Sequence, residues 1–516
     1  MKRIIIFASA LAALGMTACE TTDDGSDGAD AGATGAASAL HCTGAEGDKA
    51  VAYDNSVGIS LPAQRTCLNV TLSSMLQGTK GDTQPAAMAK DASGNFYVAG
   101  MTKGFLDTTY GDVFVAKFTP AGELTWFKTY GTNQKDAFPL TGVHDPSSGS
   151  EGMLTVDKDG GLYVIGNYMA NHGVVIKLDG DGKALWTKGV AKQAFQAVSV
   201  AKGVVHIAGD LGIYALDAAT GDNRGQFGFK LKDGAASRMF SIHATESGPI
   251  YLGGWAGFSG DDDAVLIKLK HDGTAYVVEW DQRVPSPKGA KVSSIDVAAD
   301  GAIYVGLNIT GAADVRVEVL KFDDTGKMTW ARRYGNSLQS DTNLVKVVGN
   351  QLIVAGNTLA TGTATFSDGK NGDGMLLLVN ADGTLAKEHY FFTGTNPASY
   401  DAVRDVEVID GKLIVITDHY GSANFGEWRD PNEYGDGKLE HEWKTVAPAE
   451  YLLQDTGLEQ QTGLEDLKNL DEVSEIPDGT WSDLTANALV KTVAKEAGNA
   501  HSSTVYSIIA DYLSAN

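Results

Sequence analysis

Short apolar runs come in pairs along this chain, with a polar turn between the two members of each pair. Seven segments share the pattern, and a glycine in or beside each turn precedes a run rich in Tyr, Val and Ile: 88–100, 154–166, 198–209, 242–253, 295–306, 345–356 and 406–417. Glycine at a two- to four-residue turn favours a β-hairpin. Six segments end in glycine, which we expect where backbones crowd near a central axis.

Six of the seven pairs are followed by a second strand, turn and strand. These second units cover 112–126, 174–186, 212–227, 264–277, 315–330 and 375–387. Four strands per repeat make one blade of a β-propeller, and a long internal period is typical of that architecture. The pattern therefore predicts an all-β fold, a seven-bladed β-propeller with four-stranded blades.

The seventh pair lacks its second unit, because the chain continues there into the polar stretch 421–437. Residues 68–72 precede the first pair much as 328–332 precede the sixth. We therefore predict that about 67–73 forms the outer strand of the last blade and that 438–446 supplies its remaining strand. Such a closure removes open sheet edges.

Beyond residue 446 the strand pattern gives way to two helix-like segments, 481–497 and 503–515. In the second, Val505, Ile508, Ile509, Tyr512 and Leu513 form one apolar stripe at helical spacing. We expect a small helical C-terminal extension, 447–516, that docks onto the propeller. The alternative is a helix that binds a partner or drives assembly.

The N-terminus has the form of an export signal, with Lys2 and Arg3 ahead of the apolar run 4–14. That run is too short to span a bilayer. Ala18 directly before Cys19 resembles the bacterial lipoprotein signal, in which the cysteine is acylated and becomes the new N-terminus. We predict a signal peptide at 1–19 with Cys19 as the lipidation site. Simple secretion, with Cys19 removed or left as a free thiol, is the alternative.

Residues 20–40 contain only Glu, Thr, Asp, Gly, Ser and Ala before a final Leu, so they predict a disordered linker ahead of a propeller at 41–446. Once Cys19 is set aside, Cys42 and Cys67 remain as an even pair in an exported, oxidising setting. We predict a disulfide between Cys42 and Cys67, and two unpaired thiols are the other possibility.

Composition and charge agree with this class. The 62 Gly, 18 Tyr, 17 Phe and 8 Trp suit short strands joined by tight turns. The formal net charge of −24, from 65 acidic against 41 basic residues, would repel a phosphate backbone. Nucleic acid is therefore excluded as a partner.

Two acidic turns, 157–160 and 179–182, have the start of a calcium loop. Tyr168 and Val190 stand where such a loop needs its final acidic ligand, so we interpret both as hairpin turns. Asp261, Asp262 and Asp263 are interpreted as a solvated loop.

The remaining candidate sites in the sequence have a structural interpretation. The stretch 216–221 and the tryptophans Trp126, Trp186 and Trp330 resemble features of quinoprotein propellers, yet packing between blades explains them without a cofactor. No histidine pair has metal-ligand spacing, and no Gly-x-Ser-x-Gly or phosphate loop occurs. We therefore predict no catalytic, cofactor-binding or metal-binding residues.

Residues 93–100 (SGNFYVAG) and 111–118 (GDVFVAKF) resemble the bacterial seven-bladed β-propeller repeat family. The resemblance covers roughly residues 67–446. It implies an extracytoplasmic propeller, often lipid-anchored, with no common catalytic site.

From this resemblance and the N-terminal signal we expect a scaffold in the cell envelope, held by lipid at the outer membrane, periplasmic or surface-exposed. It would bind a protein or polysaccharide partner. The alternative is a propeller-fold glycan lyase or hydrolase with its site in the central channel. Two carboxylates, or a His with a carboxylate, packed together at one channel mouth would favour the enzyme.

Overall fold

The computed structural model describes most of the repeat region and parts of the C-terminal segment. The described residues are 69–76, 83–102, 112–132, 152–168, 172–231, 236–258, 261–285, 289–309, 317–334, 340–358, 373–392, 400–420, 427–429, 444–446, 453, 456, 458–461, 464–470, 473–475, 501–510 and 512–513. Cys19, Cys42 and Cys67 lie outside them, as do the linker and the segment 481–497 for which a helix was predicted.

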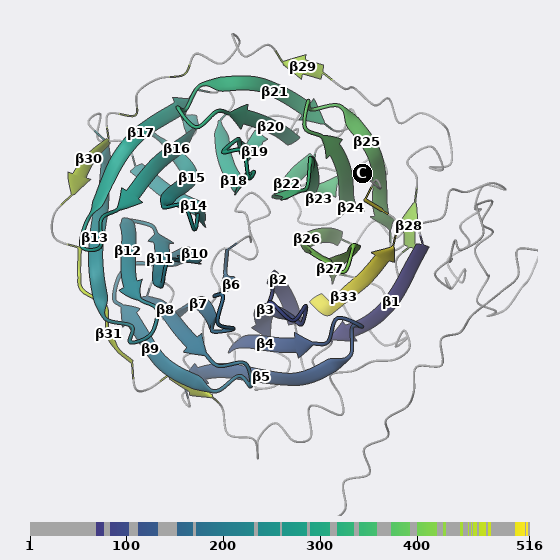
Figure 1. Cartoon of the computed structure of the whole chain (residues 1–516), viewed down its shortest axis with the longest axis horizontal. Coiled ribbons are helices and arrows are strands. Elements are labelled where there is room, and N and C mark those ends of the chain that lie inside the picture. Colours follow the sequence, from purple (N-terminus) through teal and green to yellow (C-terminus); the bar gives the residue numbers. More distant parts are fainter. Residues whose placement is uncertain are drawn as a thin grey trace, which may run out of the picture.

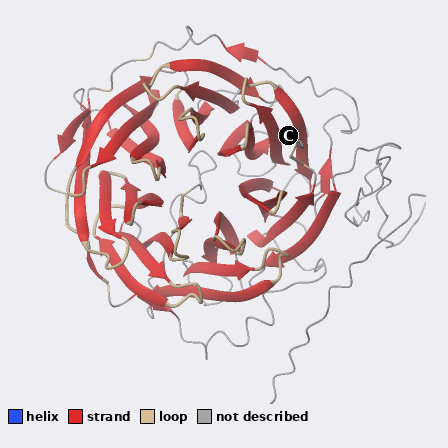
Figure 2. Cartoon of the chain, in the orientation of Figure 1, coloured by secondary structure: helices blue, strands red, loops and turns tan. Residues whose placement is uncertain are grey.

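Within these residues the strands form seven antiparallel sheets arranged around a common axis (Figure 1). Every described element is a strand, which the colouring by secondary structure makes plain (Figure 2). The part of the chain that the structure describes contains no helix long and apolar enough to cross a membrane.

Six sheets each take four consecutive strands, ordered from the axis outward. The first three comprise β2 (Thr83–Lys90), β3 (Phe96–Thr102), β4 (Asp112–Phe118) and β5 (Leu124–Thr132); β6 (Leu154–Val156), β7 (Leu162–Tyr168), β8 (His172–Leu178) and β9 (Ala184–Val190); and β10 (Phe195–Ala201), β11 (Val204–Gly209), β12 (Gly212–Asp217) and β13 (Asn223–Leu231).

The next three sheets repeat the same up-and-down order. They comprise β14 (Ala236–Ala244), β15 (Pro249–Phe258), β16 (Asp261–His271) and β17 (Tyr276–Val284); β18 (Ala290–Val297), β19 (Ile303–Ile309), β20 (Val317–Phe322) and β21 (Met328–Tyr334); and β22 (Ser340–Val348), β23 (Gln351–Thr358), β24 (Asp373–Asn380) and β25 (Leu385–Phe392). Asp261, Asp262 and Asp263 begin β16, so their interpretation as a loop is wrong.

The innermost strands touch one another all the way round the axis: β2 contacts β6, and the contacts continue through β10, β14, β18, β22 and β26 (Tyr400–Ile409) back to β2. Apolar clusters fill the spaces between neighbouring sheets. The all-β propeller with four-stranded sheets is therefore confirmed, because each sheet buries both faces against its two neighbours.

The last sheet is assembled from three distant parts of the chain. Its order from the axis outward is β26, β27 (Lys412–Tyr420), β33 (His501–Ala510) and β1 (Asn69–Leu76). The prediction that 503–515 is helical is wrong, since 501–510 pairs with β27 on one side and β1 on the other. The segment is rich in β-branched and aromatic residues, and two partner strands satisfy its backbone where an isolated helix would satisfy its own.

The prediction that 438–446 completes this last sheet is also wrong for its described part. Lys444–Val446 forms β29, which pairs with β21 in a different sheet. It belongs to a segment, 427–475, that we call the C-terminal belt.

The described strands of the C-terminal belt lie at the perimeter and add a fifth strand to five sheets (Figure 1). In chain order, β28 (Glu427–Arg429) pairs with β25, β29 with β21, β30 (Leu458–Gln461) with β13, β31 (Lys468–Asn469) with β9 and β32 (Val473–Glu475) with β5. The belt thus visits the sheets in the reverse of their order in the chain. Between β29 and β30, Leu453 packs against the core between the fourth and fifth sheets.

A bulge in the inner strand explains a glycine on the second strand of the first and fourth sheets. In β14 the bulge at Phe240 shifts the register, and in β15 a Cβ on Gly254 would lie 2.0 Å from the carbonyl oxygen of Arg238. Gly100 meets the carbonyl oxygen of Gln84 at the same distance. Gly100 and Gly254 therefore make room for the bulged neighbouring strand inside their own sheets. At Gly253 and Gly306 a Cβ would instead meet Val292 and Val345 of the next sheet.

Candidate functional site

The inner strands carry a ring of polar side chains around the axis. Each inner strand is the edge of its sheet. The backbone groups on its unpaired side therefore need hydrogen-bond partners from another sheet. Ser241 Oγ on β14 accepts the backbone N–H of Ile295 at 3.1 Å, and Ser294 Oγ on β18 accepts that of Val345 at 2.8 Å. Side chains of one sheet therefore satisfy the edge of the next.

Other inner-strand side chains also accept backbone N–H groups of the next sheet. Ser199 Oγ accepts the backbone N–H of Ala244 at 3.0 Å, and Asp296 Oδ2 accepts that of Val347 at 2.6 Å. Each acceptor stands opposite the position of the recurring tyrosine, as the pairing of Asp296 with Tyr304 shows.

Five ionisable side chains lie on consecutive inner strands around the axis. We call them the axial charge ring: His243, Asp296, Lys346, Glu407 and Lys90. His243 Nδ1 lies 3.2 Å from Asp296 Oδ1. Lys346 Nζ lies 2.6 Å from Glu407 Oε1, and Lys90 Nζ lies 3.3 Å from Glu407 Oε2. The two lysines also donate to the carbonyl oxygens of Val406 and Val408.

Asp405, next to the axial charge ring on β26, closes the seventh sheet onto the first. Its Oδ2 accepts the backbone N–H of Met88 at 2.6 Å, and its Oδ1 accepts that of Val406 at 2.7 Å. Burial raises the pKa of Asp405 to about 7, against the lowering effect of nearby Lys346. Burial alone would lower the pKa of Lys346, but the carboxylates of Glu407, Asp405 and Asp296 outweigh it and raise that pKa.

The axial charge ring and Asp405 together contain the pairs that would favour an enzyme: His243 lies beside the Asp296 carboxylate, and Asp405 lies near Glu407. The carboxylate oxygens of Asp296 and Asp405 accept backbone N–H groups, and Glu407 lies between two lysines. Carboxylates held in this way fix the positions of strands. The His243 side chain is 32% exposed, less than that of Lys90 and more than that of Lys346.

A second level of polar contacts uses asparagines just after the second-strand glycine position. Asn167 on β7 accepts the backbone N–H of Phe195 at 2.6 Å and donates to its carbonyl oxygen at 3.0 Å. Asn308 on β19 makes the same pair of bonds to Thr342. An asparagine amide mimics a peptide group here, so it extends the hydrogen bonding from one sheet to the next.

Further out, a repeated cluster that we call the aromatic clamp joins neighbouring sheets. In the first sheet Lys117 Nζ lies 5.3 Å from the centre of the Tyr97 ring and donates to the carbonyl oxygen of Gly180 in the next sheet at 3.0 Å. Trp126 Nε1 donates to the same carbonyl at 3.2 Å. The clamp therefore ties three strands of one sheet to an outer turn of its neighbour.

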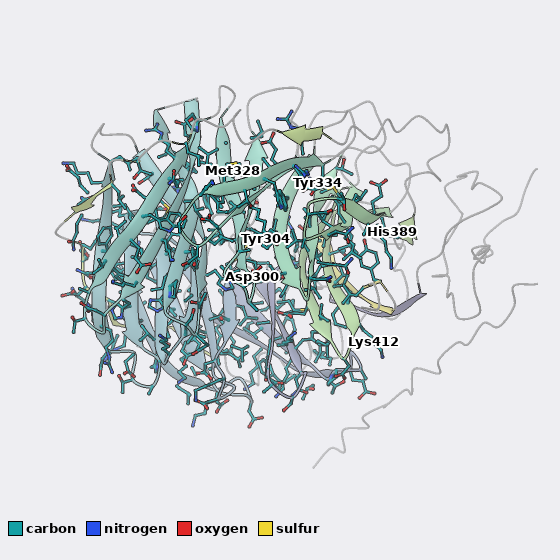
Figure 3. The ribbon with its side chains drawn as sticks, turned by 45° about the horizontal axis from the view of Figure 1, so that its top comes forward. Asp300, Tyr304, Met328, Tyr334, His389 and Lys412 are labelled. Carbon is teal, nitrogen blue, oxygen red and sulfur yellow. The ribbon has the colours of Figure 1, made fainter. Side chains whose placement is uncertain are left out.

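The aromatic clamp recurs in three further sheets. Its Tyr, Lys and Trp members are Tyr163, Lys177 and Trp186; Tyr251, Lys268 and Trp280; and Tyr304, Lys321 and Trp330. Lys177, Lys268 and Lys321 donate to the carbonyl oxygens of Ala218, Asp324 and Ala381. Trp280 and Trp330 donate to those of Asp324 and Ala381, whereas Trp186 packs in the clamp without such a bond. Figure 3 labels Tyr304 together with Tyr334, whose hydroxyl donates to the Gly383 carbonyl at 2.7 Å. The tryptophans are thus packing residues, as their interpretation from the sequence proposed.

The interface between the third and fourth sheets departs from this pattern. His206 occupies the tyrosine position, and its Nδ1 lies 2.8 Å from the hydroxyl of buried Tyr276. His271 packs edge-on against the His206 ring. Burial lowers the pKa of His206 to about 3, with a smaller contribution from His271, so the imidazole is neutral in the folded protein.

The two acidic turns, 157–160 and 179–182, are hairpin turns in which an aspartate carboxylate binds the backbone of its own turn. Asp157 Oδ1 accepts the backbone N–H groups of Asp159 and Gly161, and Asp179 Oδ1 accepts those of Asp181 and Lys183. These are Asx turns, in which aspartate is chosen for turn geometry. Among the residues that the structure describes, no group of three or more His, Cys, Asp or Glu side chains is placed to hold a metal ion.

Comparison with known proteins gives structural likenesses alone. No family model matches the chain, and no curated protein matches it. Sqt1 from Chaetomium thermophilum, solved with the N-terminus of ribosomal protein L10, aligns with a TM-score of 0.39 and 9% identity, over 67% of this chain and 96% of that one. A protein of unknown function from Dyadobacter fermentans aligns with a TM-score of 0.39 and 12% identity, over 70% and 97% of the two chains. At these scores the fold assignment rests on the sheets described above.

Proposed function

We propose that this chain is a lipid-anchored propeller of the cell envelope that acts as a binding scaffold for a protein or polysaccharide partner. Membership of the bacterial seven-bladed propeller repeat family and attachment to the outer membrane belong to the same proposal. The observation that carries it is the position of β1 as the outermost strand of the last sheet (Figure 1). A tether that precedes residue 69 would therefore join the ring at its perimeter and not at the axis.

The arrangement of the inner strands supports a rigid platform. Serine, aspartate and asparagine side chains bond one sheet to the next at two levels near the axis, and the aromatic clamps do so further out. A closed ring held at several radii presents its connecting loops from a fixed base, which lowers the ordering cost of binding.

The anchoring part is tested with Cys19→Ser in the full chain. We expect wild-type protein labelled with palmitate to fractionate with membranes and the Cys19→Ser protein to be unlabelled and released. An unlabelled wild-type protein would remove the anchor from the proposal. Intact mass under non-reducing conditions, before and after thiol alkylation, tests the proposed Cys42–Cys67 disulfide.

The binding part is tested by cross-linking in intact cells, with the wild-type chain and the Cys19→Ser protein compared. We expect one partner to be enriched with the wild-type chain and reduced when the scaffold is released from the membrane. Equal background with both proteins would contradict a scaffold role.

One observation favours the alternative, a glycan lyase or hydrolase. His243 is partly exposed and lies 3.2 Å from Asp296, which is the arrangement of a base with an orienting carboxylate. If glycan turnover by the wild-type protein is lost in His243→Ala while the melting temperature is kept, the enzyme replaces the scaffold as the function.

A further inference from the structure

We propose that the last sheet is a strand-acceptor site and that the C-terminal segment 501–513 is its closing strand, which locks the N-terminal strand and everything attached to it onto the ring. We call this segment the C-terminal latch. The proposal goes beyond the scaffold function and does not depend on lipidation, because it concerns how the ends of the chain are held.

The strand order carries the first step. In its sheet β1 has β33 as its hydrogen-bonded neighbour, with Asn69 paired to Ala510 and Leu76 paired to Thr504. The other side of β33 pairs with β27, from Leu413 opposite Ile509 to Tyr420 opposite His501. Without β33, β1 and β27 would be separated by the width of one strand. The backbone bonds of β1 therefore depend on the latch.

Tyr512 fixes the end of the latch in the neighbouring sheet. The residue is 1% exposed, its hydroxyl donates to the Leu376 carbonyl at 3.0 Å, and its ring packs against His389. Lys387 Nζ lies 5.5 Å from the ring centre and donates to the Tyr512 carbonyl oxygen at 2.6 Å. A buried aromatic with a satisfied hydroxyl is the kind of anchor that gives an inserted peptide its register.

The Tyr512 carbonyl fills a position that the repeat leaves vacant. At the other clamps a lysine or tryptophan donates to a carbonyl in the outer turn of the next sheet, as Trp330 and Lys321 do to Ala381. The last sheet has no such turn, because its two outer strands come from opposite ends of the chain. The latch supplies the missing acceptor as well as the missing strand.

The C-terminal belt explains how this chain delivers its own latch. The strands of the belt pair with sheets from the sixth back to the first. The final one, β32, pairs with β5 in the first sheet, which is the neighbour of the last sheet around the ring. The 25 residues from 476 to 500 then separate β32 from β33. The geometry points to the chain's own segment as the occupant, and a second copy would have to displace a segment already tethered nearby.

The test uses the chain ended at residue 498 and a synthetic peptide of residues 499–516. Hydrogen exchange followed by mass spectrometry reports on 69–76, with 96–102 as the internal reference. We expect 69–76 to exchange at least about tenfold faster in the truncated chain, and the peptide to restore protection with one peptide bound per ring. A peptide carrying Tyr512→Ala should bind about tenfold more weakly, and one with 501–510 scrambled should not bind.

Full-length Tyr512→Ala and Tyr512→Phe keep the proposal testable if the truncated chain does not fold. We expect exchange to rise together in 69–76 and 501–510, more in Tyr512→Ala than in Tyr512→Phe, with 96–102 unchanged. Protection of 69–76 that is independent of the latch in these variants would overturn the proposal. A wild-type dimer in light scattering that is lost on truncation would overturn the intramolecular occupant and assign the site to a second copy.

Discussion

Lys387 Nζ donates a hydrogen bond to the backbone carbonyl of Tyr512 at 2.6 Å, across 125 positions of sequence. The ammonium group also lies over the tyrosine ring. This contact joins the sixth sheet to the end of the chain, at the place where neighbouring sheets elsewhere are joined by the aromatic clamp.

Replacing Lys387 by Met should weaken this junction. The change removes a charge-assisted hydrogen bond to a carbonyl oxygen and a cation–π contact, so we expect a loss of about 2–3 kcal/mol in the free energy of unfolding. Urea denaturation measures the loss. Exposed Lys412→Met is the matched control and should change stability by less than about 0.5 kcal/mol; equal effects of the two changes would contradict the role of Lys387.

The aromatic clamp should behave as a coupled unit. Lys117 and Trp126 donate to one carbonyl oxygen, that of Gly180. Lys117→Met and Trp126→Phe each leave one donor in place, so each should cost about 1 kcal/mol, whereas the double change leaves the carbonyl without both and should exceed the sum by about 1 kcal/mol. A double-mutant cycle in urea measures the coupling, and additivity would show that the carbonyl finds water instead.

The neutral imidazole of His206 should make the free energy of unfolding depend on pH. Its folded-state pKa of about 3 lies below the unfolded value, so its contribution is present above about pH 6.5 and is lost as the pH falls toward 3. At pH 5 the loss is about 2 kcal/mol. His206→Asn keeps a polar atom for Tyr276 without titrating, so its unfolding free energy should fall less between pH 7 and pH 5 than that of the wild type.

Asp405 should make the free energy of unfolding change with pH in the opposite direction. Its folded-state pKa of about 7 lies above the unfolded value, so the native state binds the proton more tightly and stability falls as the pH rises from about 4 to 7. In Asp405→Asn this dependence disappears. The stability difference between wild type and variant should shrink by an amount on the order of 3 kcal/mol between pH 4.5 and 7.5, and a constant difference would mean that Asp405 is ionised throughout.

Gly254 should be intolerant of a single methyl group. A Cβ there would lie 2.0 Å from the Arg238 carbonyl oxygen at the bulge of β14, so Gly254→Ala forces the two strands apart and should cost about 3 kcal/mol. Gly160→Ala is the control: its Cβ would meet open space, and its positive φ should cost about 1 kcal/mol. Thermal unfolding distinguishes the two.

The sequence showed which residues could belong to the candidate site, but it did not show which of them contact one another. Trp126, Trp186 and Trp330 were visible as regular aromatics. The carbonyl oxygens that Trp126 and Trp330 bind, however, lie 54 and 51 residues away in the sequence. Asp296, Lys346 and Glu407 belong to three different repeats, and only the packing of neighbouring sheets places them side by side. A polar residue opposite the recurring tyrosine position was a sequence signal that could have revealed every member of the axial charge ring except Lys90, which pairs with Phe96.

The sequence by itself determined the hairpins, the four-stranded unit and their repetition, because alternating apolar residues and glycine turns act within a dozen neighbouring residues. The tertiary structure alone decided that 501–510 is a strand, that 444–446 joins a different sheet, and that the described strands of the C-terminal belt lie at the perimeter. Those choices depend on free strand edges created by segments hundreds of residues away. A segment with apolar residues at helical spacing becomes a strand when two such edges stand ready to accept its backbone.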